Sequence, residues 1–176
     1  PLPLRPIQIL WVNLVTDGLP AIALGLEPPE DDVMGSPPRS PQEGILGRGL
    51  WKKVLVRSVT IGATSVFIFA LAFLQTEALV YAQTMALSAL IVTQLFHVFE
   101  CRSEKRIIWE ISFKRNRILV GAVVFSFFLL LIIIYQPFLQ GVFKTYPLCA
   151  RDWYLIFFVS ILPYFAGFFL RKINRT

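Results

Sequence analysis

Long apolar runs dominate this sequence and leave few folds open to it. Each run has about the length, roughly 20 residues, with which an α-helix crosses the hydrocarbon core of a bilayer. Hydrophobic residues make up 56% of the chain and the mean hydropathy is +0.65, more apolar than a typical soluble domain. The runs predict an all-α membrane protein with five transmembrane helices, at residues 1–26, 50–74, 82–99, 118–136 and 153–170.

Lys and Arg concentrate in alternate connecting segments, which predicts the orientation of the helices. Most of them lie in or beside residues 27–49, 100–117 and the tail at 171–176. Loops rich in Lys and Arg remain on the cytoplasmic side of a membrane. We therefore expect these three segments to be cytoplasmic, the loop at 137–152 to be external, and the amino end to be external or lumenal. The expected location is the plasma membrane.

The net charge of +6 does not indicate a nucleic-acid-binding protein. The basic residues lie at the ends of apolar runs, as membrane topology requires, and no basic patch is interleaved with aromatic residues. The expected partner is the lipid bilayer, with no nucleic acid. Because Cys101 and Cys149 are predicted on opposite sides of the membrane, we expect no disulfide between them.

The first apolar run carries three oxygen-bearing side chains in its middle: Asn13, Thr16 and Asp17. Their spacing of i, i+3, i+4 would place them on one face of an α-helix. A carboxylate at membrane depth costs several kcal/mol unless it faces a partner, an ion or water. Gly18 and Pro20 follow at once and predict a helix break near 18–20, because proline cannot donate a backbone hydrogen bond. Such a site suits a hard cation, although hydrogen bonding to neighbouring helices and a simple kink remain alternatives.

The third run contains Gln94 and, one helical turn later, His97. A polar side chain within the membrane requires a partner, so Gln94 is either part of a site or an interhelical hydrogen-bonding residue. A lone histidine near a helix end is more often hydrogen-bonded than a metal ligand. We expect Glu100 to form surface ion pairs and assign no role to Cys101.

The stretch WVNLVTDGLPAIALGLEPPEDDVMGSPPRSP, residues 11–41, resembles the sixth membrane helix and following loop of P-type calcium-transporting ATPases. The similarity is to the sarcoplasmic-reticulum-like group, with a bacterial-type member expected, and it extends over nearly all 176 residues. It implies that the five spans are the sixth to tenth of such a pump. It also implies that 27–49 contacts the phosphorylation domain.

The resemblance further implies an ion site. Asn13 and Asp17 match ligands of the family, and Thr16 matches a ligand of a second calcium site. Gln94 stands where these pumps carry a glutamate, so it would be a weak ligand at most. Losing an anionic ligand weakens a calcium site, and we therefore hypothesise one calcium ion per transport cycle.

The chain lacks an Asp-Lys-Thr-Gly-Thr phosphorylation motif and a Gly-rich phosphate loop, so no catalytic or nucleotide-binding residue is predicted in it. ATP and magnesium would bind only to missing cytoplasmic domains, which together with missing amino-terminal helices are the expected partners. Manganese or a monovalent cation is the alternative ion. A standalone five-span channel or scaffold subunit is the alternative protein, made less attractive by the non-Met start at Pro1.

Overall fold

The computed structural model describes residues 1–28, 35, 44, 47, 50–102 and 116–173, with side chains as far as residue 163 in the last segment. Within these ranges all regular structure is helical. The elements are α1 (Pro6–Trp11), the π-helix η1 (Val12–Asp17), α2 (Gly18–Gly25), α3 (Leu50–Thr76), α4 (Leu79–Glu100), α5 (Arg117–Tyr135), α6 (Pro137–Phe143) and α7 (Ala150–Ile173).

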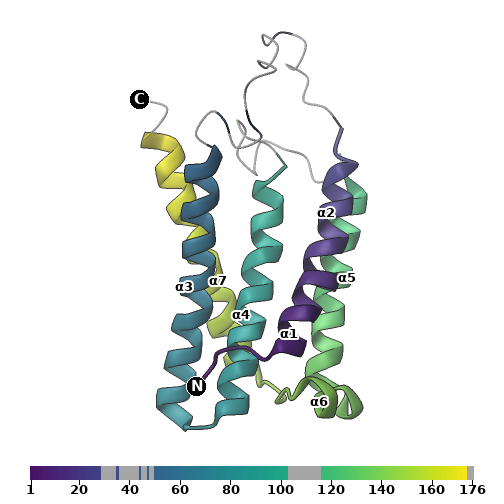
Figure 1. Cartoon of the computed structure of the whole chain (residues 1–176), viewed down its shortest axis with the longest axis vertical. Helices are drawn as coiled ribbons and strands as arrows, with labels where there is room; N and C mark the ends of the chain where they lie inside the picture. Colours follow the sequence, from purple (N-terminus) through teal and green to yellow (C-terminus); the bar gives the residue numbers. More distant parts are fainter. Residues whose placement is uncertain (29–34, 36–43, 45–46, 48–49, 103–115, 174–176) are drawn as a thin grey trace.

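The long helices stand side by side, and α6 lies across one end of them (Figure 1). We call the end that holds Arg5 and α6 the lower end, and the end that holds Glu27 and Arg102 the upper end. The helix pairs α3–α4 and α4–α7 pack together, while α5 packs against α2 and α4. α4 is therefore the central helix of the assembly, and most of its side chains are buried.

Small residues explain why α4 accepts close neighbours on several sides. Ala82, Ala86 and Ala89 are completely buried, and small side chains allow helix backbones in a membrane to approach closely. The Ser65 hydroxyl of α3 donates to the Ala86 carbonyl at 2.9 Å, and the Ser160 hydroxyl of α7 donates to the Ala89 carbonyl at 3.4 Å. Hydroxyl groups thus join α3 and α7 to the backbone of α4.

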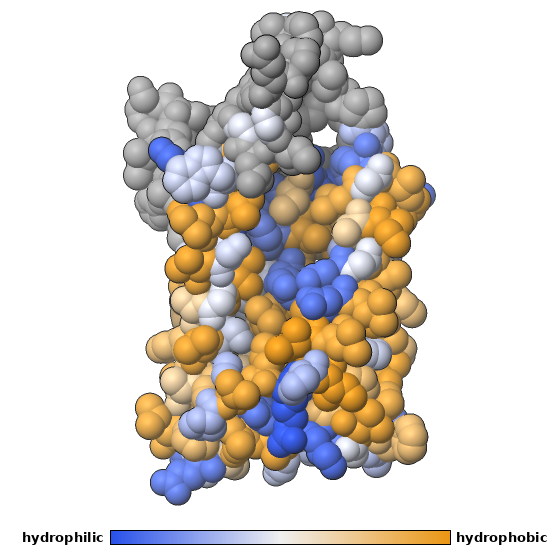
Figure 2. Space-filling model, viewed as in Figure 1, coloured by the Kyte–Doolittle hydropathy of each residue, from blue (hydrophilic) through white to orange (hydrophobic). Residues whose placement is uncertain are grey.

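Four helical segments of the described structure are long and apolar enough to cross a membrane: Pro6–Gly25, Leu50–Thr76, Leu79–Glu100 and Arg117–Tyr135. Apolar side chains cover most of the visible face between the two ends of the molecule, with hydrophilic patches near mid-height (Figure 2). The membrane-protein prediction holds. The count of five spans is not established, because the predicted span at 153–170 lies in α7, whose side chains are described only in part.

Polar contacts at the lower end attach the start of the first helical segment to α4 and α6. The Arg5 Nε donates to the Gln83 side chain at 2.9 Å, and the Gln83 amide donates to the Leu2 carbonyl at 2.8 Å. The Gln8 amide donates to the Phe143 carbonyl at 3.1 Å. These hydrogen bonds therefore hold the start of the first helical segment against α4 and α6.

Candidate functional site

The first helical segment is continuous from Pro6 to Gly25, but it is not a regular α-helix. The turn at Val12–Asp17 is π-helical, and Gly18 has ordinary right-handed helical backbone angles, φ −63° and ψ −51°. The departure from α geometry thus lies before Gly18, whereas the sequence predicted a break at 18–20. Pro20 supplies a physical reason: in an α-helix its ring would clash with the Thr16 carbonyl, and a wider preceding turn moves that carbonyl away.

The π-turn also separates the three polar side chains that α-helical spacing would have placed together. Asn13 and Asp17 are exposed, whereas Thr16 is 3% exposed. A π-helix has more residues per turn, so position i+4 remains near i while position i+3 rotates farther away. The structure therefore brings Asn13 and Asp17 to one face and directs Thr16 into the helix packing.

None of these three side chains forms a hydrogen bond or an ion pair with the residues that the structure describes. η1 packs against α4 and α5, but the Asp17 carboxylate is not neutralised by a basic group among the described residues. An unpaired carboxylate within a membrane-length helix is costly. The arrangement therefore leaves the Asp17 oxygens available to an ion.

Gln94 lies on α4, the helix against which η1 packs. Its Oε1 atom is buried and has no hydrogen-bond partner among the described residues. A buried acceptor without a partner costs about 1–3 kcal/mol, so this oxygen is suited to a donor or a cation. The structure does not place Gln94 in a hydrogen bond with the first helix, which was one of the two predicted roles.

The oxygen types present suit a hard cation carried as cargo better than a resident transition metal. No group of three or more His, Cys, Asp or Glu side chains that could hold a metal occurs in the described ranges. A cation near η1 would instead combine one carboxylate with amide, hydroxyl and backbone carbonyl oxygens. Calcium accepts such mixed oxygen sets.

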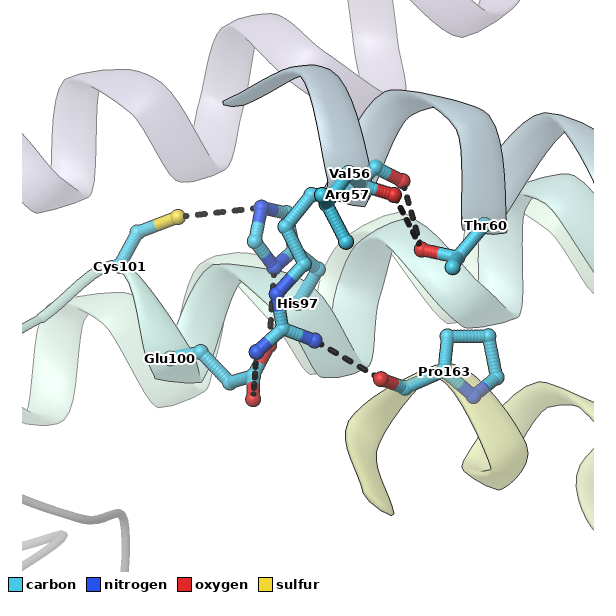
Figure 3. A network of polar contacts seen from close by, with 7 residues as sticks. All are labelled: Val56, Arg57, Thr60, His97, Glu100, Cys101 and Pro163. Atoms are coloured by element: carbon cyan, nitrogen blue, oxygen red, sulfur yellow. Dashed lines mark hydrogen bonds and ion pairs between the residues drawn. The ribbon is translucent and has the colours of Figure 1, made fainter. Parts of the chain in front are cut away.

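His97 is held by its neighbours and does not point to a metal site (Figure 3). Its Nδ1 lies 3.1 Å from a Glu100 carboxylate oxygen, and its Nε2 lies 3.5 Å from the Cys101 sulfur. Both ring nitrogens are thus engaged, as expected for a hydrogen-bonded histidine. Cys101 and Cys149 are both free thiols.

The structure contradicts the expectation that Glu100 forms a surface ion pair. Its side chain is 6% exposed and accepts a 2.6 Å bond from Arg57, which also donates to the Pro163 carbonyl at 2.9 Å. These contacts join α3, α4 and α7 (Figure 3). The missed signal was Arg57 itself, since a charge inside an apolar run requires a partner.

A second ion pair that sequence reasoning missed lies at the upper end, between the partly buried Glu27 and the buried Arg102. The Arg102 Nη2 donates to Glu27 Oε1 at 2.9 Å, and the Arg102 side chain is 2% exposed. Both residues lie in segments predicted as cytoplasmic loops, Glu27 in 27–49 and Arg102 in 100–117, and were therefore expected to be solvated. No local pattern links positions 75 residues apart.

Comparison with known proteins identifies the family. Residues 1–173 match the family described as "Cation transporting ATPase, C-terminus". The chain is 48% identical over 175 residues to a calcium-transporting ATPase of Bacillus subtilis, covering 98% of this chain and 20% of that protein. It is 39% identical over 157 residues to calcium-transporting ATPase type 2C member 2 of Rattus norvegicus, covering 89% of this chain and 17% of that protein.

A calcium-transporting ATPase 1 of Bacillus cereus is 35% identical over 176 residues, covering 92% of this chain and 20% of that protein. The chain thus spans about a fifth of the length of these relatives. The match of the family model over almost the whole chain agrees with the helical membrane architecture and with the earlier resemblance. This chain belongs to the carboxy-terminal family of cation-transporting ATPases.

Proposed function

We propose that this chain is the ion-translocating membrane part of an ATP-driven P-type pump, and that calcium is its substrate. The observation that carries the proposal is the Asp17 carboxylate, which has no partner among the described residues and lies on a π-helical turn in a membrane-length helix. A dehydrated cation against Asp17 offsets the cost of a charge in lipid. The three relatives described above are calcium-transporting ATPases, which supports the choice of ion.

The exposure of Asn13 and Asp17 supports a larger site than this chain contains. Calcium takes 6–8 oxygen ligands, more than the side chains near η1 supply. The remaining ligands would come from amino-terminal membrane helices of the same pump that cover this face. Its cytoplasmic domains would bind ATP and magnesium and would contact residues 27–49.

Asp17 would provide the main charge, Asn13 a neutral oxygen, and Gln94 a weak ligand. Thr16 is oriented into the packing and would contribute only after a local change. With a single carboxylate in the set, we propose that one calcium ion moves per cycle. Isotope binding measured against the amount of phosphoenzyme tests this, and a ratio near two ions would refute the single-ion proposal.

Transport follows from how sensitive such a site is to geometry. Phosphorylation of a distant aspartate in the pump would tilt the helices and separate the oxygens around Asp17. Because calcium binding requires many oxygens at about 2.3–2.6 Å, a small displacement lowers the affinity. The ion would then leave on the far side.

We propose five spans, with α7 as the fifth, an external amino end, a cytoplasmic carboxy end, and a plasma-membrane location. The distribution of Lys and Arg supports the orientation. The upper end would then face the cytoplasm. Labelling of single cysteines with a membrane-impermeant reagent, introduced at positions 3 and 44, checks the orientation.

The proposal is tested by Asp17→Asn in the full-length protein, with calcium-dependent phosphorylation from ATP as the readout. We expect the calcium concentration for half-maximal phosphorylation to rise by at least about tenfold, because a charged ligand becomes neutral. Asp152→Asn is the matched control, since Asp152 accepts from Tyr81 near the lower end and is far from η1 in sequence. An unchanged calcium response in Asp17→Asn removes Asp17 from the site.

The alternative of a standalone channel or scaffold is not favoured, because the relatives are ATPases. Reading the gene upstream of Pro1 decides the matter: a phosphorylation domain there supports the pump. Competition by manganese or by monovalent cations in the phosphorylation assay tests the alternative ions. Stimulation by a monovalent cation in the absence of calcium would overturn the ion assignment.

A further inference from the structure

The first helical segment, Pro6–Gly25, carries the proposed ion site and is called the ion-site segment below. Its upper end is held by a largely buried polar cluster that we call the Glu27 clasp, formed by Glu27, Arg102 and Asn116. The Arg102 Nε lies 3.2 Å from both Glu27 carboxylate oxygens, and Nη2 lies 2.9 Å from Oε1. The Asn116 amide donates to Glu27 Oε2 at 2.7 Å and to the Ala23 carbonyl at 3.0 Å. The clasp thus joins three separate helices.

Each member of the clasp comes from a different chain segment. Glu27 follows α2, Arg102 follows α4, and Asn116 is the N-cap of α5, where its Oδ1 accepts from the Leu119 amide at 2.8 Å. Asn116 is 4% exposed and the Glu27 side chain is 15% exposed. Separating a buried charge pair leaves uncompensated charges, so the clasp resists sliding of α2 along α4.

The clasp has a direct geometric link to the proposed ion site. Asp17 lies 10 residues before Glu27, and Gln94 lies 8 residues before Arg102. The helical parts of these stretches end at Gly25 and Glu100, and at a rise of about 1.5 Å per residue they are about 12 Å and 9 Å long. A connection at Glu27–Arg102 therefore fixes the height of Asp17 relative to Gln94.

We propose that the Glu27 clasp sets the register between the ion-site helix and α4, so that Glu27, Arg102 and Asn116 are positioning residues for calcium binding. The clasp touches no ion. It fixes the height of the Asp17 oxygens relative to that of the Gln94 oxygen, and its loss allows the site to loosen while the pump remains folded. This inference rests on the proposed function.

A matched control exists in the same molecule. Arg57 and Glu100 form another largely buried pair near the upper end, at 2.6 Å. Among the described residues their hydrogen bonds join α3, α4 and α7, and none of them reaches the ion-site segment. If calcium binding weakens only because the helix bundle is less stable, breaking either pair should weaken it. If it weakens because η1 shifts along α4, only breaking the clasp should weaken it.

The test compares Arg102→Gln with Arg57→Gln in the full-length protein, measuring phosphorylation from ATP against calcium concentration. We expect Arg102→Gln to raise the half-maximal calcium concentration by about fivefold, with the maximal phosphorylation preserved, and Arg57→Gln to change it by less than about twofold. A shift of equal size in both variants overturns the proposal. So does a lower maximum with an unchanged half-maximal concentration in Arg102→Gln.

A mutant cycle makes the test independent of any single variant. Glu27→Gln should give a shift similar to that of Arg102→Gln, and the double variant should exceed neither, because both remove the same interaction. Additive shifts would overturn the proposal. Asn116→Ser keeps an N-cap oxygen for Leu119 but removes the amide donor. We expect it to raise the half-maximal calcium concentration by less than Arg102→Gln does.

If Arg102→Gln fails to accumulate, Arg102→Lys decides the question, because lysine retains the charge but not the two-point contact. An intermediate shift supports the clasp and an unchanged half-maximal concentration refutes it. Asp17→Asn, assayed in parallel, separates the two levels of inference. If Asp17→Asn raises the half-maximal calcium concentration and Arg102→Gln does not, the clasp proposal alone is refuted. If Asp17→Asn leaves that concentration unchanged, both the clasp proposal and the proposed function are refuted.

Discussion

Two buried side-chain oxygens lack a hydrogen-bond partner among the described residues, and only one of them lies beside the proposed ion site. Gln94 Oε1 lies on the helix that packs against η1, while Ser126 Oγ lies on α5. An unsatisfied buried polar atom lowers stability, so its presence requires an explanation. Gln94 has one in the proposed ion site. Nothing in the structure assigns a function to Ser126.

This difference yields a prediction at the residue scale. Gln94→Leu keeps the side-chain volume but removes the oxygen, and we expect the half-maximal calcium concentration to rise by about three- to tenfold because a ligand is lost. The measurement is calcium-dependent phosphorylation of the full-length protein. If Gln94 served only as a helix-packing residue, Leu would leave the calcium response unchanged and increase the thermal stability.

Ser126→Ala is the companion change. Removing an unpartnered hydroxyl eliminates a desolvation cost of about 1 kcal/mol or more, so we expect an equal or higher temperature of thermal inactivation with an unchanged calcium response. A clear loss of stability would show that the Ser126 hydroxyl has a partner outside the described residues. The two variants together separate a buried oxygen used for the ion from one that is not.

At the scale of the element, the unusual feature is the π-turn of the first helical segment. The polar residues Asn13, Thr16 and Asp17 all lie in it, and Pro20 follows within one turn. π-Turns occur frequently at functional sites because they redirect side chains without ending the helix. Here the turn places Asn13 and Asp17 on one face and buries Thr16.

Pro20→Ala tests whether the proline maintains this geometry. Alanine restores a backbone donor and lacks the ring that would clash with the Thr16 carbonyl in an α-helix, so the turn should relax toward an α-helix. We expect weaker calcium binding in the phosphorylation assay together with greater helix stability. An unchanged calcium affinity would mean that the π-turn does not depend on Pro20.

Gly18→Ala is the control for that experiment. Gly18 has right-handed helical angles, and an added Cβ would meet only the Asn13 carbonyl oxygen, at 3.9 Å. Within the described structure alanine therefore fits. The calcium response of Gly18→Ala should remain close to that of the parent, and a large loss would place another helix against this position.

At the scale of the whole molecule, α4 organises the packing and buried charge pairs connect its upper end to its neighbours. Arg57–Glu100 joins it to α3 and α7, and Arg102–Glu27 joins it to the first helical segment. Such pairs are not strong sources of stability compared with apolar packing, but breaking one is costly because a buried charge remains. Their role is to specify which helix lies beside which.

Glu100→Gln provides the stability prediction. It leaves Arg57 without its carboxylate, and a loss of about 3 kcal/mol in stability is expected for a broken buried pair. Thermal inactivation of the full-length protein in detergent measures it. Replacing both Arg57 and Glu100 by apolar side chains should recover much of the loss, because no unpaired Arg57 charge remains. No recovery would contradict the assignment of the loss to that charge.

Most of the architecture was predictable from the sequence, because membrane helices are encoded locally. Apolar length located the long helices, and the distribution of Arg and Lys predicted an orientation. The short helix α6, Pro137–Phe143, was missed, because it lies in the segment predicted as a loop at 137–152. The polar positions of the candidate site were visible as charges and amides in apolar surroundings. The partners of Glu27, Glu100 and Arg102 were not predictable, since they come from positions far apart in the chain.

The sequence by itself determined that this chain is a bundle of membrane-length helices, because the bilayer requires long apolar runs with internally paired backbones. It also predicted Asn13, Thr16, Asp17 and, weakly, Gln94 as the candidate ion ligands. Only the tertiary structure decided that Thr16 turns inward, that the helix widens instead of breaking, and that Glu27 is held by Arg102 and Asn116. The physical reason is that side-chain direction and pairing depend on which helices pack against each other, and the local sequence does not specify that packing.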